Sequence, residues 1–283
     1  MLLAARQADS WGRRKPPAGT PVNPGHPLAR GLVACWPYND GLSRVRDLTL
    51  NGYDGTPSNL VTQAAGNFGG PALSFVSTGG TYVNCGAAIN AAIASTPCSF
   101  VVWANPRSLG LNQDLFRNDN GGATVGFLLR VNTGNVLQFY SLPSVTLTQG
   151  STALAAGVWY QFAATFDGGA NKVLVYVNGV QDGSGSAGQA SLGNSPFSFL
   201  HGAYFPDISV RESWGGLIDH GAVYNRVLSP AEVAWLYREP FAFFQRPTPS
   251  RLWSGGPPAA AAPTFNPGWA YGATRGVLGT GVG

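Results

Sequence analysis

Long apolar runs are missing from this 283-residue sequence. The first five residues are apolar, but Arg6 ends the run, and the basic residues follow it instead of preceding it as they do in a secretion signal. No other run approaches the roughly 20 apolar residues that a membrane-spanning helix needs. We therefore expect neither a secretion signal of this type nor a membrane partner.

Charged side chains are also scarce, at 11% of residues, and lysine occurs only at positions 15 and 172. The net charge of +4 therefore comes from arginine. The one basic cluster is Arg6, Arg13, Arg14 and Lys15, and no aromatic stacking platform or nucleic-acid-binding motif accompanies it. We interpret it as a solvated terminal segment, with an acidic protein surface as the alternative partner, and we do not expect nucleic-acid binding.

Cysteine is limited to three residues. Cys35, Cys85 and Cys98 cannot all pair within one chain, and no C-x-x-C spacing suggests a metal site. We expect three free, buried thiols that behave as small apolar side chains. The alternative, in an oxidising compartment, is a disulfide between Cys85 and Cys98.

Glycine and proline are abundant, with 39 and 21 residues, and they separate short apolar runs. This punctuation, without a Gly-X-Y period, is typical of all-β folds. The strands that the pattern predicts are 72–76, 82–85, 98–104, 124–131, 136–140, 159–167, 172–177, 197–200 and 216–224.

Local signals predict one hairpin and one helix. The Asn-Gly pair at 178–179 follows the strand 172–177 and favours a tight type I′ turn. Ser229, Pro230 and Glu232 form the capping-box pattern that begins a helix, and the helix should end before Pro240.

The two ends of the chain differ from its middle, because they are rich in proline and have no hydrophobic period. We divide the chain into an extended N-terminal arm (1–26), a folded domain (27–240) and a Pro/Ala/Gly-rich C-terminal arm (241–283). We expect both arms to contact other protein subunits, in a homo-oligomer or a larger assembly. The arm residues expected to do so are Arg13, Arg14, Phe243, Phe244, Trp253, Trp269 and Tyr271.

Four sequence elements, in order, resemble a known family. They are Phe100-Val-Val-Trp103, Trp159-Tyr-Gln-Phe-Ala-Ala-Thr-Phe-Asp-Gly168, Val175-Tyr-Val-Asn-Gly179, and the closing pair Gly216-Leu-Ile-Asp219 and Val223-Tyr-Asn-Arg-Val-Leu-Ser-Pro-Ala-Glu-Val233. Together they are similar to the laminin-G-like branch of the concanavalin A-like lectin and glucanase superfamily, as found in phage and environmental proteins. The resemblance covers about residues 27–240.

The resemblance implies a jelly-roll sandwich of two antiparallel sheets, with ligands met at a concave face or at the rim loops. The alternating residues of 159–167 are apolar on both sides, which suits a central strand inside such a sandwich. Asn225 and Arg226 are expected to tie the last strand to the capping helix through side-chain hydrogen bonds.

Catalysis is not expected. Glucanases of this superfamily use two carboxylates a few residues apart on one strand. Here glutamate occurs only at positions 212, 232 and 239, two of them at the ends of the predicted helix, and Glu212 has no acidic partner nearer than Asp207. The three histidines are scattered, and no nucleophile elbow or His-Glu-x-x-His motif is present.

Calcium is the one cofactor that the resemblance brings into consideration, because relatives bind it with Asp, Asn and backbone oxygen atoms. The residues 118–120 and Asp207 could supply such atoms. Each is more simply explained as a turn residue, so we assign no metal site and keep calcium as the weaker alternative.

The segment 201–214 is the candidate ligand-binding loop, because aromatic rings, an acid and an arginine occur together there. The alternative is that its aromatic rings only cover the edge of the sandwich. The candidate contact residues are Tyr204, Phe205, Asp207, Arg211 and Trp214.

Three functions compete on this evidence. The first is a non-enzymatic virion decoration protein or another assembly component, located in a virion or outside the cell. The second is an extracellular carbohydrate-binding lectin module. The third, a glycosidase, lacks its carboxylate pair, and jelly-roll folds host so many functions that the fold cannot decide among the three.

Overall fold

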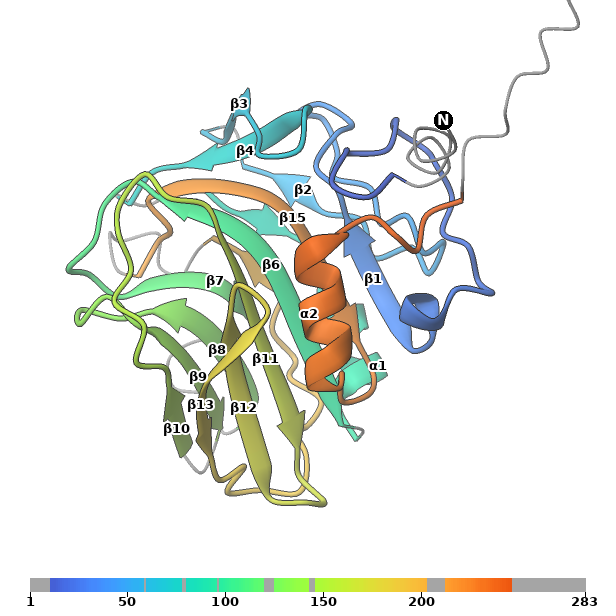
Figure 1. Ribbon diagram of the computed structural model, residues 1–283. Helices are drawn as coiled ribbons and strands as arrows, with labels where there is room; N and C mark the ends of the chain where they lie inside the picture. The colour runs from blue at the N-terminus through green and yellow to red at the C-terminus, as the bar shows by residue number, and fades with distance from the viewer. Residues whose placement is uncertain are drawn as a thin grey trace, which may run out of the picture. The chain divides into compact units, whose positions relative to one another are not determined.

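Two antiparallel β-sheets make up the part of the protein that the computed structural model describes (Figure 1). The described residues are 11–58, 60–77, 80–95, 97–119, 125–142, 146–202 and 212–245. The expected sandwich is confirmed, with one nine-residue helix after the last strand. Nowhere in these ranges is a helix long and apolar enough to span a bilayer.

One sheet has eight strands in the order β13-β12-β11-β6-β15-β4-β3, and β1 also pairs with β15. Its strands are β1 (Leu32–Trp36), β3 (Thr62–Ala65), β4 (Pro71–Phe75), β6 (Cys98–Pro106), β11 (Tyr160–Asp167), β12 (Lys172–Val177), β13 (Val180–Gly185) and β15 (Gly216–Tyr224).

The other sheet has seven strands in the order β10-β9-β8-β7-β14-β5-β2. They are β2 (Thr56–Pro57), β5 (Val83–Asn84), β7 (Gln113–Arg117), β8 (Gly126–Val131), β9 (Leu137–Leu142), β10 (Thr146–Gln149) and β14 (Leu200–His201). Short helical segments, η1 (Pro27–Ala29) and α1 (Ala88–Ile93), lie outside the sheets, as does helix α2 (Pro230–Arg238).

The alternation of β11 explains why this strand lies at the centre of the larger sheet. Phe162, Ala164 and Phe166 enter the main core between the sheets, whereas Ala163 joins a second apolar cluster on the opposite face. Gln161 on that second face is fully buried as well. The larger sheet is therefore buried on both of its faces here, as the sequence predicts.

The local signals in the sequence are also confirmed. Asn178 and Gly179 adopt φ values of 53° and 79°, as a type I′ turn requires, and join β12 to β13. Ser229 and Glu232 form the reciprocal capping box of α2. Arg226 donates to Glu232 Oε1 at 2.7 Å and to the Arg30 carbonyl, which ties the end of β15 to the helix.

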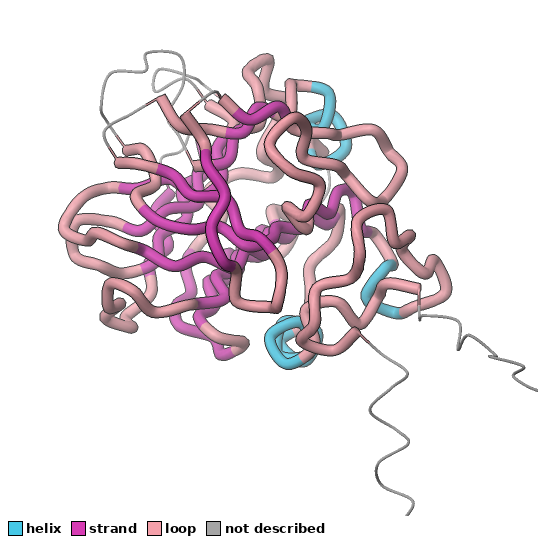
Figure 2. Tube along the Cα trace, turned by 90° about the horizontal axis from the view of Figure 1, so that it is seen from above, coloured by secondary structure: helices cyan, strands magenta, loops and turns pink. Residues whose placement is uncertain are grey.

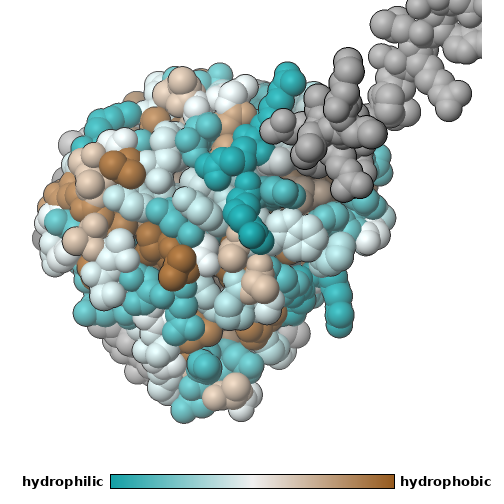
Figure 3. Space-filling view, in the orientation of Figure 1, coloured by the Kyte–Doolittle hydropathy of each residue, from teal (hydrophilic) through white to brown (hydrophobic). Residues whose placement is uncertain are grey.

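Helix α2 and the segments at both ends of the described region cover the outer face of the larger sheet (Figure 1). Seen from above in Figure 2, the helical segments lie outside the strand layers. The indole of Trp103 stacks on the Tyr237 ring at 5.5 Å, and Phe241, Phe243 and Phe244 are each no more than 1% exposed. The surface that results mixes hydrophilic and hydrophobic residues (Figure 3).

The first and last segments of the described region are paired with each other, which corrects the expectation of extended arms for residues 11–26 and 241–245. Val22 forms an isolated β-bridge with Phe244, and Trp11 Nε1 donates to the Gln245 carbonyl at 2.7 Å. We call residues 11–30 together with 239–245 the terminal clasp. It forms because Phe243 and Phe244 bury more apolar surface against their own sheet than an extended arm would.

Arg13 belongs to this clasp. Its guanidinium lies 5.3 Å from the ring centres of Phe68 and Trp103 and donates to the Tyr237 carbonyl at 3.0 Å. Phe243 and Phe244 are thus buried contacts within the domain rather than free assembly residues. Arg13 makes contacts within the domain but is exposed, as is Arg14, so a role of these two arginines in assembly stays a prediction. Trp253, Trp269 and Tyr271 lie outside the described residues.

A buried ion pair lies under the clasp. Lys15 pairs with Asp219 of β15, and their side chains are 2% and 0% exposed. Lys15 Nζ also donates to the Asp219 and Pro71 carbonyls, at 3.0 and 2.5 Å. Burial lowers the pKa of Lys15 and raises that of Asp219, while their mutual attraction opposes both shifts. The pair therefore fastens the N-terminal segment to the central strand β15.

Replacing Lys15 with methionine should destabilise the domain by about 3–5 kcal/mol, because the variant leaves the Asp219 carboxylate buried without its cation. The pKa of Asp219 then rises further, so native protein binds a proton that unfolded protein does not. The loss should therefore be smaller at pH 5 than at pH 8. The loss of unfolding free energy is measured by urea unfolding of the wild-type and variant full chains at both pH values.

The matched control is Lys172→Met, because Lys172 is the other lysine and is exposed at the start of β12. It should change the free energy of unfolding by about 0.5 kcal/mol or less. Equal effects of the two substitutions would show that the ion pair does not fasten the clasp.

Candidate functional site

The outer face of the seven-stranded sheet carries the largest group of charged side chains in the described ranges. A bulge at Leu115 in β7 creates it, since the pairing register with β8 shifts between Asp114 and Phe116. Residues three apart on a regular strand face opposite sides, but the extra residue brings Asp114 and Arg117 to the same side. Leu115 and Phe116 both enter the core.

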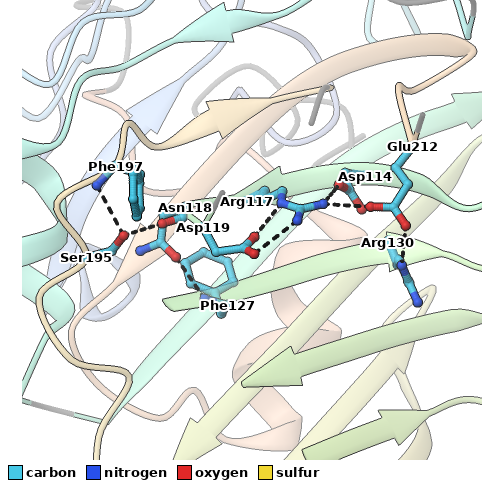
Figure 4. A network of polar contacts seen from close by, with 9 residues as sticks. All are labelled: Asp114, Arg117, Asn118, Asp119, Phe127, Arg130, Ser195, Phe197 and Glu212. Carbon is cyan, nitrogen blue, oxygen red and sulfur yellow. Dashed lines mark hydrogen bonds and ion pairs between the residues drawn. The ribbon is translucent and has the colours of Figure 1, made fainter. Parts of the chain in front are cut away.

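Arg117 is the centre of this group (Figure 4). Its Nη1 donates to Asp114 Oδ2 and Glu212 Oε2, each at 2.7 Å, and its Nη2 donates to Asp119 Oδ2 at 3.0 Å. The side chains of Arg117, Asp114 and Asp119 are at most 3% exposed, whereas Glu212 is 24% exposed. The guanidinium thus satisfies three carboxylates away from bulk water.

Burial raises the pKa of Asp114 from 3.8 to about 7, although the charge and hydrogen bond of Arg117 oppose the shift. Glu212 adds negative charge beside Asp114 and contributes to the same rise. Glu212 has φ 69°, in the left-handed region that non-glycine residues seldom adopt. Its carbonyl accepts from Asp114 N at 2.7 Å, so its backbone is fastened to β7 at this point.

A hydrogen-bonded row extends from Glu212 across β8, β9 and β10. Arg130 donates to Glu212 Oε1 at 3.0 Å and to Gln138 Oε1 at 3.1 Å, and Gln138 donates to Gln149 Oε1 at 3.0 Å. The Arg130 guanidinium lies 4.7 Å from the centre of the Tyr140 ring. Along this row the side chains become more accessible, because Arg130 and Tyr140 are half-buried and Gln149 is exposed.

Asn118 connects the other side of the network to helix α1. It donates to Asn90 Oδ1 at 3.0 Å. Its own Oδ1 accepts from Phe127 N at 2.8 Å (Figure 4). Asn90 in turn donates to the Ser195 and Phe197 carbonyls. These bonds hold the segment after β7 in place from both sides.

The predicted ligand loop is described only in part. Tyr204, Phe205, Asp207 and Arg211 lie outside the described residues. Trp214 is fully buried in the main core, and its Nε1 donates to the Leu217 carbonyl at 3.3 Å. This burial corrects the expectation that the Trp214 ring contacts a ligand, since the ring instead packs the beginning of β15 into the sandwich.

Glu212 does have an acidic neighbour, Asp114, and shares Arg117 with a further acid, Asp119. Asp114 lies in β7 and Asp119 just after it, so both are far from Glu212 in the sequence. Calcium does not fit the candidate donors that are described, because Asn118 Oδ1 accepts from a backbone amide and Asp119 pairs with Arg117. In the described ranges no three His, Cys, Asp or Glu side chains form a metal site.

Raising the pH from 5 to 8 should destabilise the wild-type protein relative to an Asp114→Asn variant, by an amount on the order of a few kcal/mol. The folded pKa of about 7 exceeds the unfolded value, so the native state keeps a proton that the unfolded state releases. Stability is then lost as the pH rises through the folded pKa. Urea unfolding of both proteins at pH 5 and pH 8 isolates the contribution of Asp114. If the difference in unfolding free energy between the two proteins is the same at both pH values, the raised pKa of Asp114 is contradicted.

Comparisons with known proteins agree with this architecture. A family model described as the concanavalin A-like lectin/glucanases superfamily, of laminin-G type, matches residues 77–234. No curated protein sequence matches the chain.

Several solved structures share the fold at low sequence identity. Domain 4 of AbnA, a GH43 extracellular arabinanase from Geobacillus stearothermophilus in complex with arabinotriose, is 22% identical, with TM-score 0.57 over 73% of this chain and 98% of that one. The binding domain of Paraclostridial Mosquitocidal Protein 1 is 16% identical, with TM-score 0.58 over 73% and 52%. A Trypanosoma rangeli sialidase is 16% identical, with TM-score 0.55 over 74% and 33%.

The family match spans more than half of the sequence, and its boundaries fall within the sandwich described above. The chain therefore belongs to the concanavalin A-like lectin/glucanases superfamily, in its laminin-G-like branch.

Proposed function

We propose that the protein is a non-enzymatic carbohydrate-binding module that contacts glycan through the outer face of the seven-stranded sheet. The observation that carries the proposal is the row of planar polar side chains on this face, Gln149, Gln138, Arg130 and Glu212, with the Tyr140 ring beside it. The row becomes accessible to solvent toward β9 and β10.

This arrangement suits sugars for a chemical reason. Sugar hydroxyl groups both donate and accept hydrogen bonds, and planar amides and guanidinium groups can meet adjacent hydroxyls in fixed directions. An aromatic ring with a polar tip, such as Tyr140, can pack against the apolar face of a sugar ring while its hydroxyl stays hydrated. The side chains of the row are already held by hydrogen bonds to one another. Sugar binding therefore has few side chains left to order, which keeps its entropy cost low.

The AbnA domain supports this proposal, since it shares the fold over nearly its whole length and its structure contains arabinotriose. The likeness is one of fold, so it favours a glycan ligand without selecting the sugar. An oligosaccharide of pentose units is therefore a sensible first probe.

Hydrolysis is not part of the proposal. A glycosidase needs one carboxylate as general acid and a second as nucleophile or base, with the substrate between them. Asp114 and Glu212 do approach each other, but Arg117 Nη1 lies between them and bonds both. The position where a sugar would react is thus occupied by a guanidinium group.

The assembly function remains a prediction for residues 246–283, which lie outside the described ranges. Two of the residues expected to serve assembly, Phe243 and Phe244, are instead buried within their own domain. The lectin reading is therefore the better supported of the two.

The full chain should bind at least one member of a glycan panel saturably, and the same soluble oligosaccharide should compete. The panel should contain neutral pentose and hexose oligosaccharides, arabinotriose included, and sialylated and uronic-acid oligosaccharides. Bound sugars should be recovered intact, as measured by chromatography of the eluate. Failure to bind any member would contradict the proposed function, and release of shortened sugars would contradict its non-enzymatic character.

A further inference from the structure

A second feature of the same sheet is a groove of about 430 Å³ at its edge, where β2 pairs with β5. Thr56 and Asn84 face each other across this pair, and Leu200 of β14 connects Asn84 to Arg117 on the same face. The groove is thus continuous in register with the polar face already described. Its lining is Asp54, Thr56, Pro57, Ser58, Tyr82, Asn84, Cys85 and Gly86.

The groove differs from the Arg117 network in having polar groups that are not engaged. Within the described residues, the hydroxyls of Thr56 and Tyr82 and the amide nitrogen of Asn84 have no hydrogen-bond partner. Asn84 Oδ1 accepts from Gly86 N at 2.8 Å, which orients its free NH₂ group. Tyr82 is held through its backbone, since its N–H donates to Ser58 Oγ at 3.2 Å.

The charge of the groove is balanced by the protein itself. Asp54 Oδ2 pairs with Arg44, and Asp54 Oδ1 accepts from Asp47 N at 2.7 Å. The groove lining therefore has no cationic side chain to pair with an acidic sugar. It also has no unpaired carboxylate to pair with a cationic ligand. Hydroxyl groups of a neutral sugar match its remaining donors and acceptors.

The Cys85 side chain, which also lines the groove, is uncharged as well. Cys85 Sγ lies 3.6 Å from His201 Nε2, and His201 Nδ1 lies 2.6 Å from the Tyr38 hydroxyl. Burial lowers the pKa of His201 to about 3 and raises that of the Cys85 thiol. Imidazole and thiol are both neutral near pH 7, so Cys85 lines the groove as a thiol, with His201 and Tyr38 buried behind it, and no reactive thiolate forms.

We propose that the groove at the β2–β5 edge is a sugar-binding subsite that takes a neutral oligosaccharide, with the Tyr82 ring against the sugar and Asn84 and Thr56 bonded to its hydroxyls. This inference rests on the proposed carbohydrate-binding function and adds the subsite and the ligand class. The half-buried ring and the three unengaged polar groups carry it.

The test compares three full-chain variants with the wild-type protein by calorimetry. Tyr82→Ala removes the ring, and Asn84→Asp keeps the oxygen that accepts from Gly86 but removes the NH₂ donor. Gln181→Ala, at an exposed position of β13 in the other sheet, is the control. Thermal unfolding of each variant confirms that it is folded. The soluble probes are arabinotriose, xylotriose and cellotriose as neutral sugars and sialyllactose as the acidic sugar.

For each neutral probe that the wild-type protein binds, the Kd of both groove variants should be about tenfold higher or more. The Kd of Gln181→Ala should be unchanged. Wild-type affinity in folded groove variants would overturn the subsite and leave the carbohydrate-binding function standing. Sialyllactose bound as tightly as the neutral probes would overturn the ligand class. No binding by the wild-type protein to these probes or to the wider panel would overturn the proposed function and the subsite together.

Discussion

Burial of both faces of the eight-stranded sheet is the constraint on which the rest of the domain depends. One face lies in the core between the sheets, and the other presents Val101, Trp103 and Tyr176, which need a second layer over them. Helix α2 and the terminal clasp supply that layer. The clasp also buries charged groups, Lys15 and Asp219, and these form an ion pair in which each charge has its partner. The ends of the described region are therefore part of the fold.

The sequence predicted those parts of the fold that local patterns determine. The bounds of β12 and β15 and the cap at Ser229 were all recognisable, since alternation and capping are properties of neighbouring residues. Strand β7 was missed, because Gln113-Asp-Leu-Phe-Arg117 has polar residues at both ends and no alternation. Its bulge has no signal in a single sequence. The sequence alone places Phe243 and Phe244 in a free arm, because their partners, such as Val22, lie far away in the sequence.

The candidate site was less predictable for the same physical reason. In the sequence Glu212 is an isolated acid, because its partners come from β7 and β8. Only the sheet register shows that Asp114, Arg117 and Arg130 share one face. The groove lining, from Asp54 to Gly86, contains no motif. Turn residues and short strands form it, and their unengaged hydroxyl and amide groups are visible only once the hydrogen bonds are known.

Strand β15 also has a consequence for the order in which the protein can fold during its synthesis. It pairs with β1, β4 and β6, and β1 has no other partner among the described strands. Until residue 224 has left the ribosome, the edges of β1 and β6 that pair with β15 stay open. The layer over the outer face of this sheet is completed later still, by residues 230–245. The nascent chain therefore carries unpaired strand edges through most of its translation. At this stage chaperone binding would do most to prevent aggregation.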